Sequence, residues 1–200
     1  MRELEHFLID GAYGWNQELF EDNWMNRGGC AAVTACEICI CLARTKGMTN
    51  LYPFDAGNIT REDYLAFARI MRPYLHPRPA GINRTSVYMD GFRDDLATCP
   101  GPTLRMRSVE GDEPYAAARQ AVRDSLDRGF PVAYLMLLHT DKSLEDYHWH
   151  WFLLNAYDET PQGFMVRVVT YGEWRRFELG HLWDTGHDRK GGLVVFSKEE

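Results

Sequence analysis

The sequence lacks any long apolar run. Its longest apolar stretches, such as residues 132–138, are far too short to cross a bilayer. The first residues, MRELEHFLIDGAYGW, have no basic start followed by an apolar segment, so they do not resemble a signal peptide. Repeats, low-complexity tracts and Pro/Gly-rich linkers are also missing. We therefore expect no membrane partner, a cytoplasmic location and one domain that spans residues 1–200.

Positive charge is in short supply. Lysine and arginine number 22 against 29 aspartate and glutamate, which gives a net charge of −7. Proteins that bind nucleic acid rely on clustered basic side chains to neutralise phosphates. The composition therefore disfavours a nucleic-acid partner.

Cysteine is present, but not in the pattern of a disulfide framework. The chain has five cysteines, an odd number, and four of them lie close together, at positions 30, 36, 39 and 41. Disulfide-stapled secreted domains spread their cysteines along the chain. We expect reduced thiols.

The sequence does contain ample material for a core. Apolar residues make up 45% and aromatic residues 13%. Apolar periodicity, capping residues and glycines predict helices over 30–46, 60–74, 85–96 and 115–127, and strands over 131–138, 149–157, 164–170 and 192–196. Residues 1–29 and 97–114 have no regular pattern and are expected to be irregular or turn-rich. Helices followed by strands indicate an α+β domain with a mainly antiparallel sheet.

Cys30 is the first residue whose surroundings suggest chemistry. It follows Gly28 and Gly29 and begins the helix predicted over 30–46. Unpaired backbone N–H groups and the positive end of the dipole favour a thiolate at such a position, and the same N–H groups can face an oxyanion. A nucleophilic cysteine also needs a base, and His150 stands at the start of an apolar strand.

Four segments occur in an informative order: GGCAAVTA, SLDRGFPVAYLML, HWHWFLLNAYDE and FMVRVVTYGEW. This order resembles the papain-like cysteine peptidase superfamily, and most of all its bacterial branch related to the double-glycine leader peptidases. Residues 23–36 and 125–172 carry the resemblance, whereas 48–112 match nothing in the family and are expected to form a helical insertion or lobe.

The resemblance implies a papain-like fold, in which an N-terminal helix bearing the nucleophile packs on a C-terminal antiparallel sheet. It implies that Cys30 is the nucleophile and His150 the general base of a cysteine peptidase, or of a related amide hydrolase or acyl transferase. A peptide or protein substrate follows from it. No cofactor is expected, because the side chain itself supplies the nucleophile.

Two elements of the family pattern have no obvious counterpart, and the first is the oxyanion donor. The family has a Gln shortly before the Cys, and this sequence has none at that distance. Asn23 is the nearest amide substitute and Asn26 the second, although both also suit turn or cap positions. Gln17 is too remote unless the loop doubles back.

The second is the residue that orients the imidazole. The family places an Asn in an Asn-Ser-Trp-Gly stretch, which here reads Val169-Thr170-Tyr171-Gly172. Valine cannot accept a proton, whereas Thr170 could bond the imidazole if the register shifts by one. Asp158 and Asn155 are weaker candidates. Without such a residue the chain works as a Cys-His dyad, or the orienting group comes from elsewhere in the chain, or the chain is a papain-like binding module that has lost catalysis.

His148 competes with His150. Residues two apart on a strand share a face, so both imidazoles could reach Cys30, and Trp149 and Trp151 would face the other way as packing residues. We favour His150, because an apolar run follows it directly.

The two histidines also suit a metal-dependent hydrolase. Imidazoles on one face can bind one Zn²⁺ or Fe²⁺ ion if His139, Glu145 or Asp146 adds a third ligand. We consider this the weaker alternative.

Overall fold

The computed structural model describes residues 1–199, which form an α+β fold with a mainly antiparallel sheet. Its six α-helices are α1 (Asn23–Gly28), α2 (Cys30–Lys46), α3 (Arg61–Met71), α4 (Thr85–Leu96), α5 (Tyr115–Asp127) and α6 (Leu179–Trp183). Three 3-10 helices accompany them: η1 (Gln17–Leu19), η2 (Thr49–Leu51) and η3 (Lys142–Tyr147). The strands are β1 (Arg2–Glu3), β2 (Leu8–Ile9), β3 (Ala12–Tyr13), β4 (Leu104–Glu110), β5 (Val132–Met136), β6 (His150–Thr160), β7 (Gly163–Thr170), β8 (Glu173–Glu178) and β9 (Gly192–Lys198).

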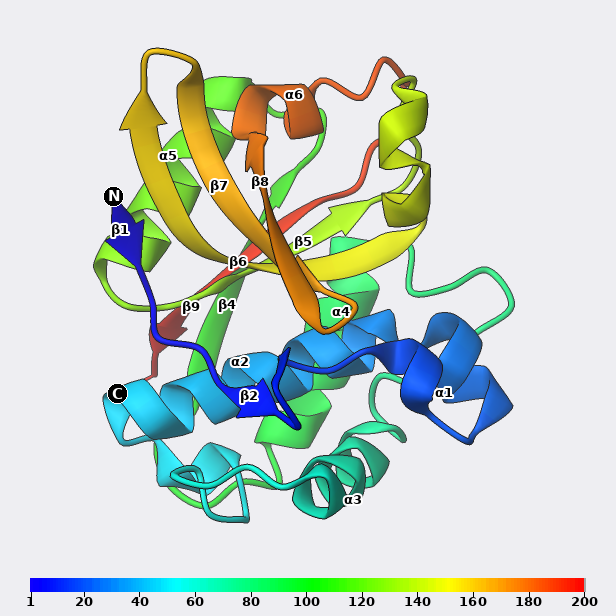
Figure 1. Ribbon diagram of the computed structural model, residues 1–200, viewed down its shortest axis with the longest axis vertical. Coiled ribbons are helices and arrows are strands. Elements are labelled where there is room, and N and C mark those ends of the chain that lie inside the picture. The colour runs from blue at the N-terminus through cyan, green and yellow to red at the C-terminus, as the bar shows by residue number, and fades with distance from the viewer. Residues whose placement is uncertain (200) are drawn as a thin grey trace.

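The main sheet has the strand order β4-β9-β5-β6-β7-β8, and the short β1 pairs with β6 beside this path. Each of its pairings is antiparallel. Strands β2 and β3 form a separate hairpin. The long strands β6 and β7 curve strongly across the molecule (Figure 1).

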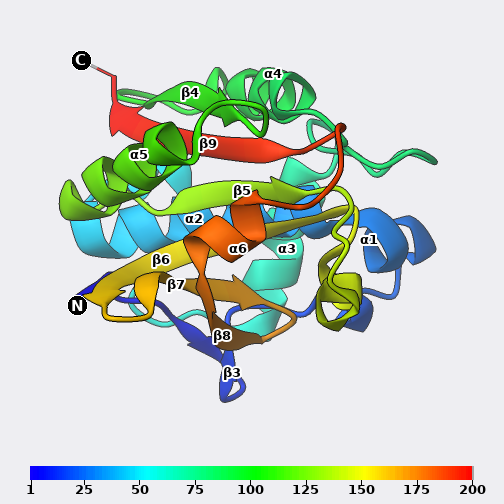
Figure 2. The same ribbon diagram turned by 90° about the horizontal axis from the view of Figure 1, so that it is seen from above.

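The sheet is covered on both faces, and its central strands alternate accordingly. Ala133 and Leu135 of β5 join the apolar cluster that includes α2, α3 and α4. Tyr134 and Met136 join the cluster that includes α5 and α6. Successive side chains of a strand point to opposite faces, so a strand buried on both sides reads as a continuous apolar run. Figure 2 shows α2 behind β5 and β6 and α5 and α6 in front of them.

Helix α2 is the central helix, and residues 30–43 are buried throughout. It contains neither Pro nor Gly and ends at Gly47, whose φ of 64° is the left-handed conformation that glycine adopts most easily. Its main sheet partner is β6. The buried stretch includes one carboxyl group, Glu37, which is only 2% exposed.

The helices predicted over 30–46, 60–74, 85–96 and 115–127 are confirmed as α2 to α5, and the four predicted strands as β5, β6, β7 and β9. Thr60 caps α3 by accepting a hydrogen bond from the Asp63 N–H group. All five cysteines are free thiols, as expected. Within residues 1–199, no helix is both long and apolar enough to span a membrane.

Several elements were not predicted, among them the two edge strands β4 and β8 and the helix α1. Residues 97–114, expected to be turn-rich, contain the edge strand β4, so the segment 48–112 is not purely helical. The other edge strand, β8, reads EWRRFE and is largely exposed. Edge strands bury few side chains and therefore carry little apolar alternation. The third is α1, within residues 1–29, which is short and buries only Met25.

Candidate functional site

A cleft of about 860 Å³ opens where α1 and the start of α2 meet the start of β6 and the turn between β7 and β8. Its volume is in the range of small-molecule and peptide sites. The lining residues are Gln17, Asn23, Trp24, Arg27, Gly28, Cys30, Pro77, Arg78, Pro79, Ala80, Gly81, Asn83, His148, Trp149, His150, Tyr171 and Arg189. The predicted Cys30 and His150 thus lie in one cleft.

Cys30 occupies the corner between two helices. Gly29 is at once the C-cap of α1 and the N-cap of α2, and its N–H donates to the Met25 carbonyl oxygen. A Cβ atom at Gly29 would overlap that same oxygen. The close approach therefore requires glycine at this corner, and it presents Cys30 to the cleft as the first residue of α2.

The Cys30 sulfur lies against the start of β6. The backbone N–H groups of Trp151, Ala31 and Cys30 itself act to lower the pKa of the Cys30 thiol. Burial acts in the opposite direction and is the larger effect, so the pKa of Cys30 is raised. The expectation that the helix start favours the thiolate is therefore wrong for this fold, because desolvation outweighs the N–H groups.

His150 is held from two sides. Its Nε2 lies 2.7 Å from Thr170 Oγ1, and its ring stacks on Tyr171 with the centroids 4.6 Å apart and an interplanar angle of 4°. The Tyr171 hydroxyl donates to the Asp146 carbonyl oxygen at 3.0 Å and lies 3.5 Å from Nδ1. Burial lowers the pKa of His150 to about 3. The imidazole is therefore neutral at physiological pH.

Cys30 and His150, which line the same cleft, are therefore both neutral in the resting protein. Thr170 Oγ1 can accept a hydrogen bond from the Nε2–H group of His150, which leaves a lone pair on Nδ1. A neutral imidazole in this tautomer can take the thiol proton as sulfur attacks a carbonyl. Tyr171, which the sequence reasoning did not select, belongs to the site because it stacks on this ring; its place directly after Thr170 was the signal.

The three amide side chains considered as oxyanion donors, Asn23, Asn26 and Gln17, differ in their surroundings. Asn23 lines the cleft and is exposed. Asn26 instead donates to the carbonyl oxygens of Glu18 and Phe20, as a residue that shapes the loop would. Gln17 was judged too remote, yet the chain doubles back and brings this buried side chain to the cleft. Its Nε2 donates to the Asn26 carbonyl oxygen at 3.1 Å.

The weaker orienting candidates lie elsewhere. Val169 is buried in the core cluster that includes α2. Asn155 donates to the Tyr13 hydroxyl, and Asp158 pairs with the N-terminal amine and with Arg176. Neither lines the cleft. Of the three candidates, only Thr170 contacts the imidazole, and its orienting role remains a prediction.

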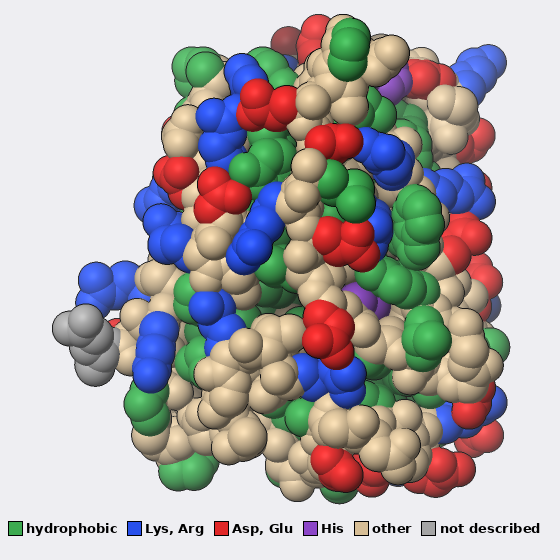
Figure 3. Space-filling view, turned by 60° about the vertical axis from the view of Figure 1, so that its left-hand side comes forward, with side chains coloured by type: hydrophobic (Ala, Val, Ile, Leu, Met, Phe, Trp, Pro, Cys, Tyr) green, Lys and Arg blue, Asp and Glu red, His purple; other side chains and the backbone are tan. Residues whose placement is uncertain are grey.

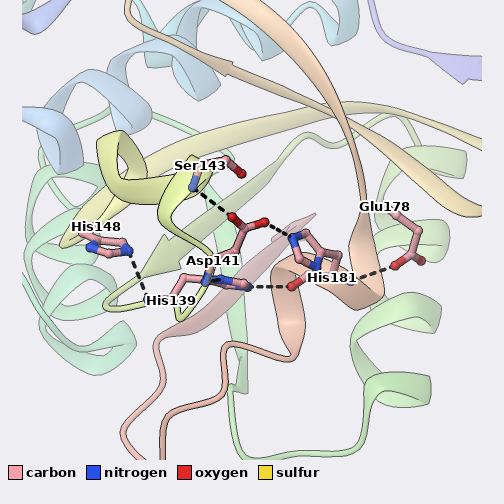
Figure 4. A network of polar contacts seen from close by, with 6 residues as sticks. All are labelled: His139, Asp141, Ser143, His148, Glu178 and His181. Atoms are coloured by element: carbon pink, nitrogen blue, oxygen red, sulfur yellow. Dashed lines mark hydrogen bonds and ion pairs between the residues drawn. The ribbon is translucent and has the colours of Figure 1, made fainter.

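His148 belongs to a second polar network, which Figure 4 shows between η3 and α6. Its Nε2 accepts a hydrogen bond from the His139 N–H group at 3.1 Å. His139 accepts from the Asp141 N–H group at Nδ1 and, through Nε2, donates to the His181 carbonyl oxygen. The network ties the loop before β6 to α6.

This network argues against the metal-dependent alternative. The hydrogen bond from His139 occupies His148 Nε2, and Thr170 occupies His150 Nε2. Across residues 1–199, no three His, Cys, Asp or Glu side chains are arranged to hold a metal ion. Glu145 and Asp146 are exposed, and neither lines the cleft.

The expected alternation of side chains along residues 148–151 is wrong at Trp149. Its φ of 54° is left-handed, so β6 begins only at His150 and His148 does not share a strand face with it. Trp149 is 44% exposed and lines the cleft instead of packing in the core. Trp151, by contrast, is buried as expected, and its Nε1 donates to the Ile82 carbonyl oxygen at 2.6 Å.

Comparison of the chain with protein-family models, with curated proteins and with solved structures finds no match.

Proposed function

We propose that the chain is a cysteine peptidase or a related thiol-dependent amide hydrolase or acyl transferase of papain-like architecture. One observation carries the proposal: Cys30 and His150 line the same cleft, and His150 Nε2 lies 2.7 Å from Thr170 Oγ1. Segments far apart in the sequence thus bring together a nucleophile, a base and a group that orients the base.

The reaction begins from the neutral pair. Cys30 Sγ attacks the carbonyl carbon of an amide while its proton passes to His150 Nδ1, so no resting thiolate is needed. The backbone N–H groups of Cys30 and Ala31, which act on the pKa of the thiol, stabilise the oxyanion, and Asn23 or Gln17 adds an amide donor.

His150 then returns the proton to the leaving amine, and a thioester remains on Cys30. Water completes hydrolysis by attacking the thioester, with His150 again taking the proton. An amine in place of water would complete an acyl transfer. The thiol is regenerated in both cases, so no cofactor enters the cycle.

The test is site-specific alkylation followed by peptide mapping. Iodoacetamide should label Cys30 faster than Cys99, although Cys99 is the only one of the five thiols that is not buried. The rate at Cys30 should fall in His150→Ala and stay unchanged in Cys99→Ala, the matched control. Circular dichroism tests whether each variant is folded. If His150→Ala does not fold, Thr170→Val serves as the second variant.

A papain-like binding module without catalysis is the second candidate. Two observations favour this alternative. Val169 stands where the family has its orienting Asn, and burial raises the pKa of Cys30. Equal labelling of Cys30 and Cys99, with no effect of His150→Ala, would overturn the hydrolase proposal and support the binding module.

A further inference from the structure

The charge of the cleft is opposite to that of the whole chain. Its lining contains three arginines, Arg27, Arg78 and Arg189, and neither aspartate nor glutamate, whereas the chain as a whole carries a net charge of −7. Guanidinium groups stay protonated at any physiological pH. The cleft is therefore a positive region on a negative protein.

The three arginines come from different parts of the fold. Arg27 is on α1, Arg78 is on the segment after α3, and Arg189 is on the loop before β9. All three are exposed. The Arg189 guanidinium lies 5.3 Å from the centroid of the Trp149 ring, which holds it at the cleft wall. Their convergence on one cleft is a property of the fold and not of a basic stretch of sequence.

Their charges are also uncompensated within the protein. In the region that the structure describes, residues 1–199, none of the three has a carboxylate oxygen within 4.0 Å, the limit for an ion pair. Some arginines outside the cleft do pair, as Arg167 does with Glu3 and Arg176 with Asp158. Figure 3 shows a face on which basic and acidic side chains intermingle. A concave surface lined by one sign of charge attracts ligands of the other sign.

The remaining walls suit a peptide. Trp24 is 54% exposed and Trp149 is 44% exposed, and both line the cleft. Exposed tryptophans beside arginines are typical of binding surfaces, because they provide apolar area next to charge. A cleft of about 860 Å³ has room for a short extended segment but not for a folded domain.

We propose that the cleft binds an acidic peptide, with carboxylates on the residues that flank the amide presented to Cys30. The inference rests on the proposed function for the chemistry at Cys30, and on the three arginines for the choice of substrate. An acidic segment would lie across Arg27, Arg78 and Arg189 and against the two tryptophans.

The first experiment measures binding alone. A fluorescein-labelled peptide rich in Glu is titrated with the Cys30→Ala protein, followed by anisotropy, beside the same peptide with Gln in place of Glu. Two unit charges near 6 Å in water-like surroundings attract enough to change affinity about threefold. Arg27→Gln, Arg78→Gln and Arg189→Gln should each weaken binding of the acidic peptide by about that factor, and more strongly at low salt.

The control for these variants is Arg105→Gln, which removes an exposed arginine of β4 outside the cleft lining and should leave the affinity unchanged. The second experiment uses the unaltered protein, in which the acidic peptide should slow iodoacetamide labelling of Cys30 and the Gln peptide should not. Protection of this kind places the peptide at the sulfur.

The outcomes separate the two proposals. Equal binding of the two peptides, or binding without protection of Cys30, would overturn the acidic-peptide inference. An oligodeoxynucleotide of equal charge that binds more tightly and protects Cys30 would overturn it in favour of a polyphosphate ligand. The third outcome is that the acidic peptide binds selectively and protects Cys30, while iodoacetamide labels Cys30 no faster than Cys99. This result would support the acidic ligand and count against the hydrolase.

Discussion

Glu37 offers the sharpest quantitative test of the fold, because it is a carboxyl group inside the core. Its Oε1 accepts a hydrogen bond from the Trp15 N–H group at 2.8 Å, and its Oε2 lies 3.6 Å from His6 Nε2. Burial raises the pKa of Glu37 from 4.5 to about 8 and lowers that of His6 to about 3. Both groups are therefore neutral in the folded protein near pH 7.

The raised pKa fixes the sign of the pH dependence. Between pH 4.5 and pH 8 the unfolded chain has lost the Glu37 proton, whereas the folded protein retains it. The contribution of Glu37 to the free energy of unfolding must fall as pH rises through this window, by about 1.4 kcal/mol per pH unit. From pH 5 to pH 7 the loss amounts to about 2.5 kcal/mol after allowing for partial ionisation of the unfolded chain near its pKa.

Glu37→Gln should remove this dependence. Glutamine has the shape of the protonated acid, keeps an acceptor for the Trp15 N–H group and places an amide donor toward His6 Nε2. The stability of the variant relative to the wild type should therefore rise with pH by the amounts above. Glu21→Gln, which changes an exposed carboxyl group, should show no such trend.

The assay is urea unfolding under reducing conditions, monitored by tryptophan fluorescence from about pH 5 to about pH 8. Subtracting the variant from the wild type at each pH cancels the contributions of other titrating groups. A difference that stays constant over this range would show that Glu37 is ionised in the folded protein and would refute the reasoning.

Three further changes test the site and its support. Thr170→Val should slow alkylation of Cys30 about tenfold, because the loss corresponds to one hydrogen bond to His150. Thr170→Ser keeps a hydroxyl group and should retain the rate. Equal rates in the two variants would contradict an orienting role for Thr170. Trp151→Phe leaves the Ile82 carbonyl oxygen unpaired in the core and should lower the free energy of unfolding by about 1–3 kcal/mol. Urea titration measures this loss, and an unchanged midpoint would argue against the hydrogen bond from Trp151 to Ile82. Asp22→Ala removes the N-cap of α1, which accepts from two backbone N–H groups, and should cost about 1 kcal/mol by the same assay unless the cap contributes nothing.

The helices could be predicted because their signals are local. Thr60 and Gly47 mark ends through capping and a left-handed φ, and both act within a few residues of the chain. The contact between His150 and Thr170 was foreseen as one possible register of a strand pairing. Such features depend on periodicity, which the sequence displays directly.

The remainder depends on tertiary structure. Gln17 reaches the cleft because α1 turns the chain back, and no spacing rule encodes that path. The left-handed φ of Trp149 turns its side chain from core to cleft, and a strand pattern does not reveal it. The raised pKa of Cys30 results from burial by elements that converge on α2, whereas the helix start that suggested a thiolate is a local feature.

The single glycine shared by α1 and α2 has a mechanical consequence. Because Gly29 ends one helix and starts the next, Arg27 and Cys30 flank the same bend. A ligand that displaces α1 would therefore act on the bend that carries the sulfur. Selectivity on this side of the cleft and alignment of the reacting atom therefore cannot be adjusted independently, and substitutions in α1 that alter what the protein accepts should also alter how fast it reacts.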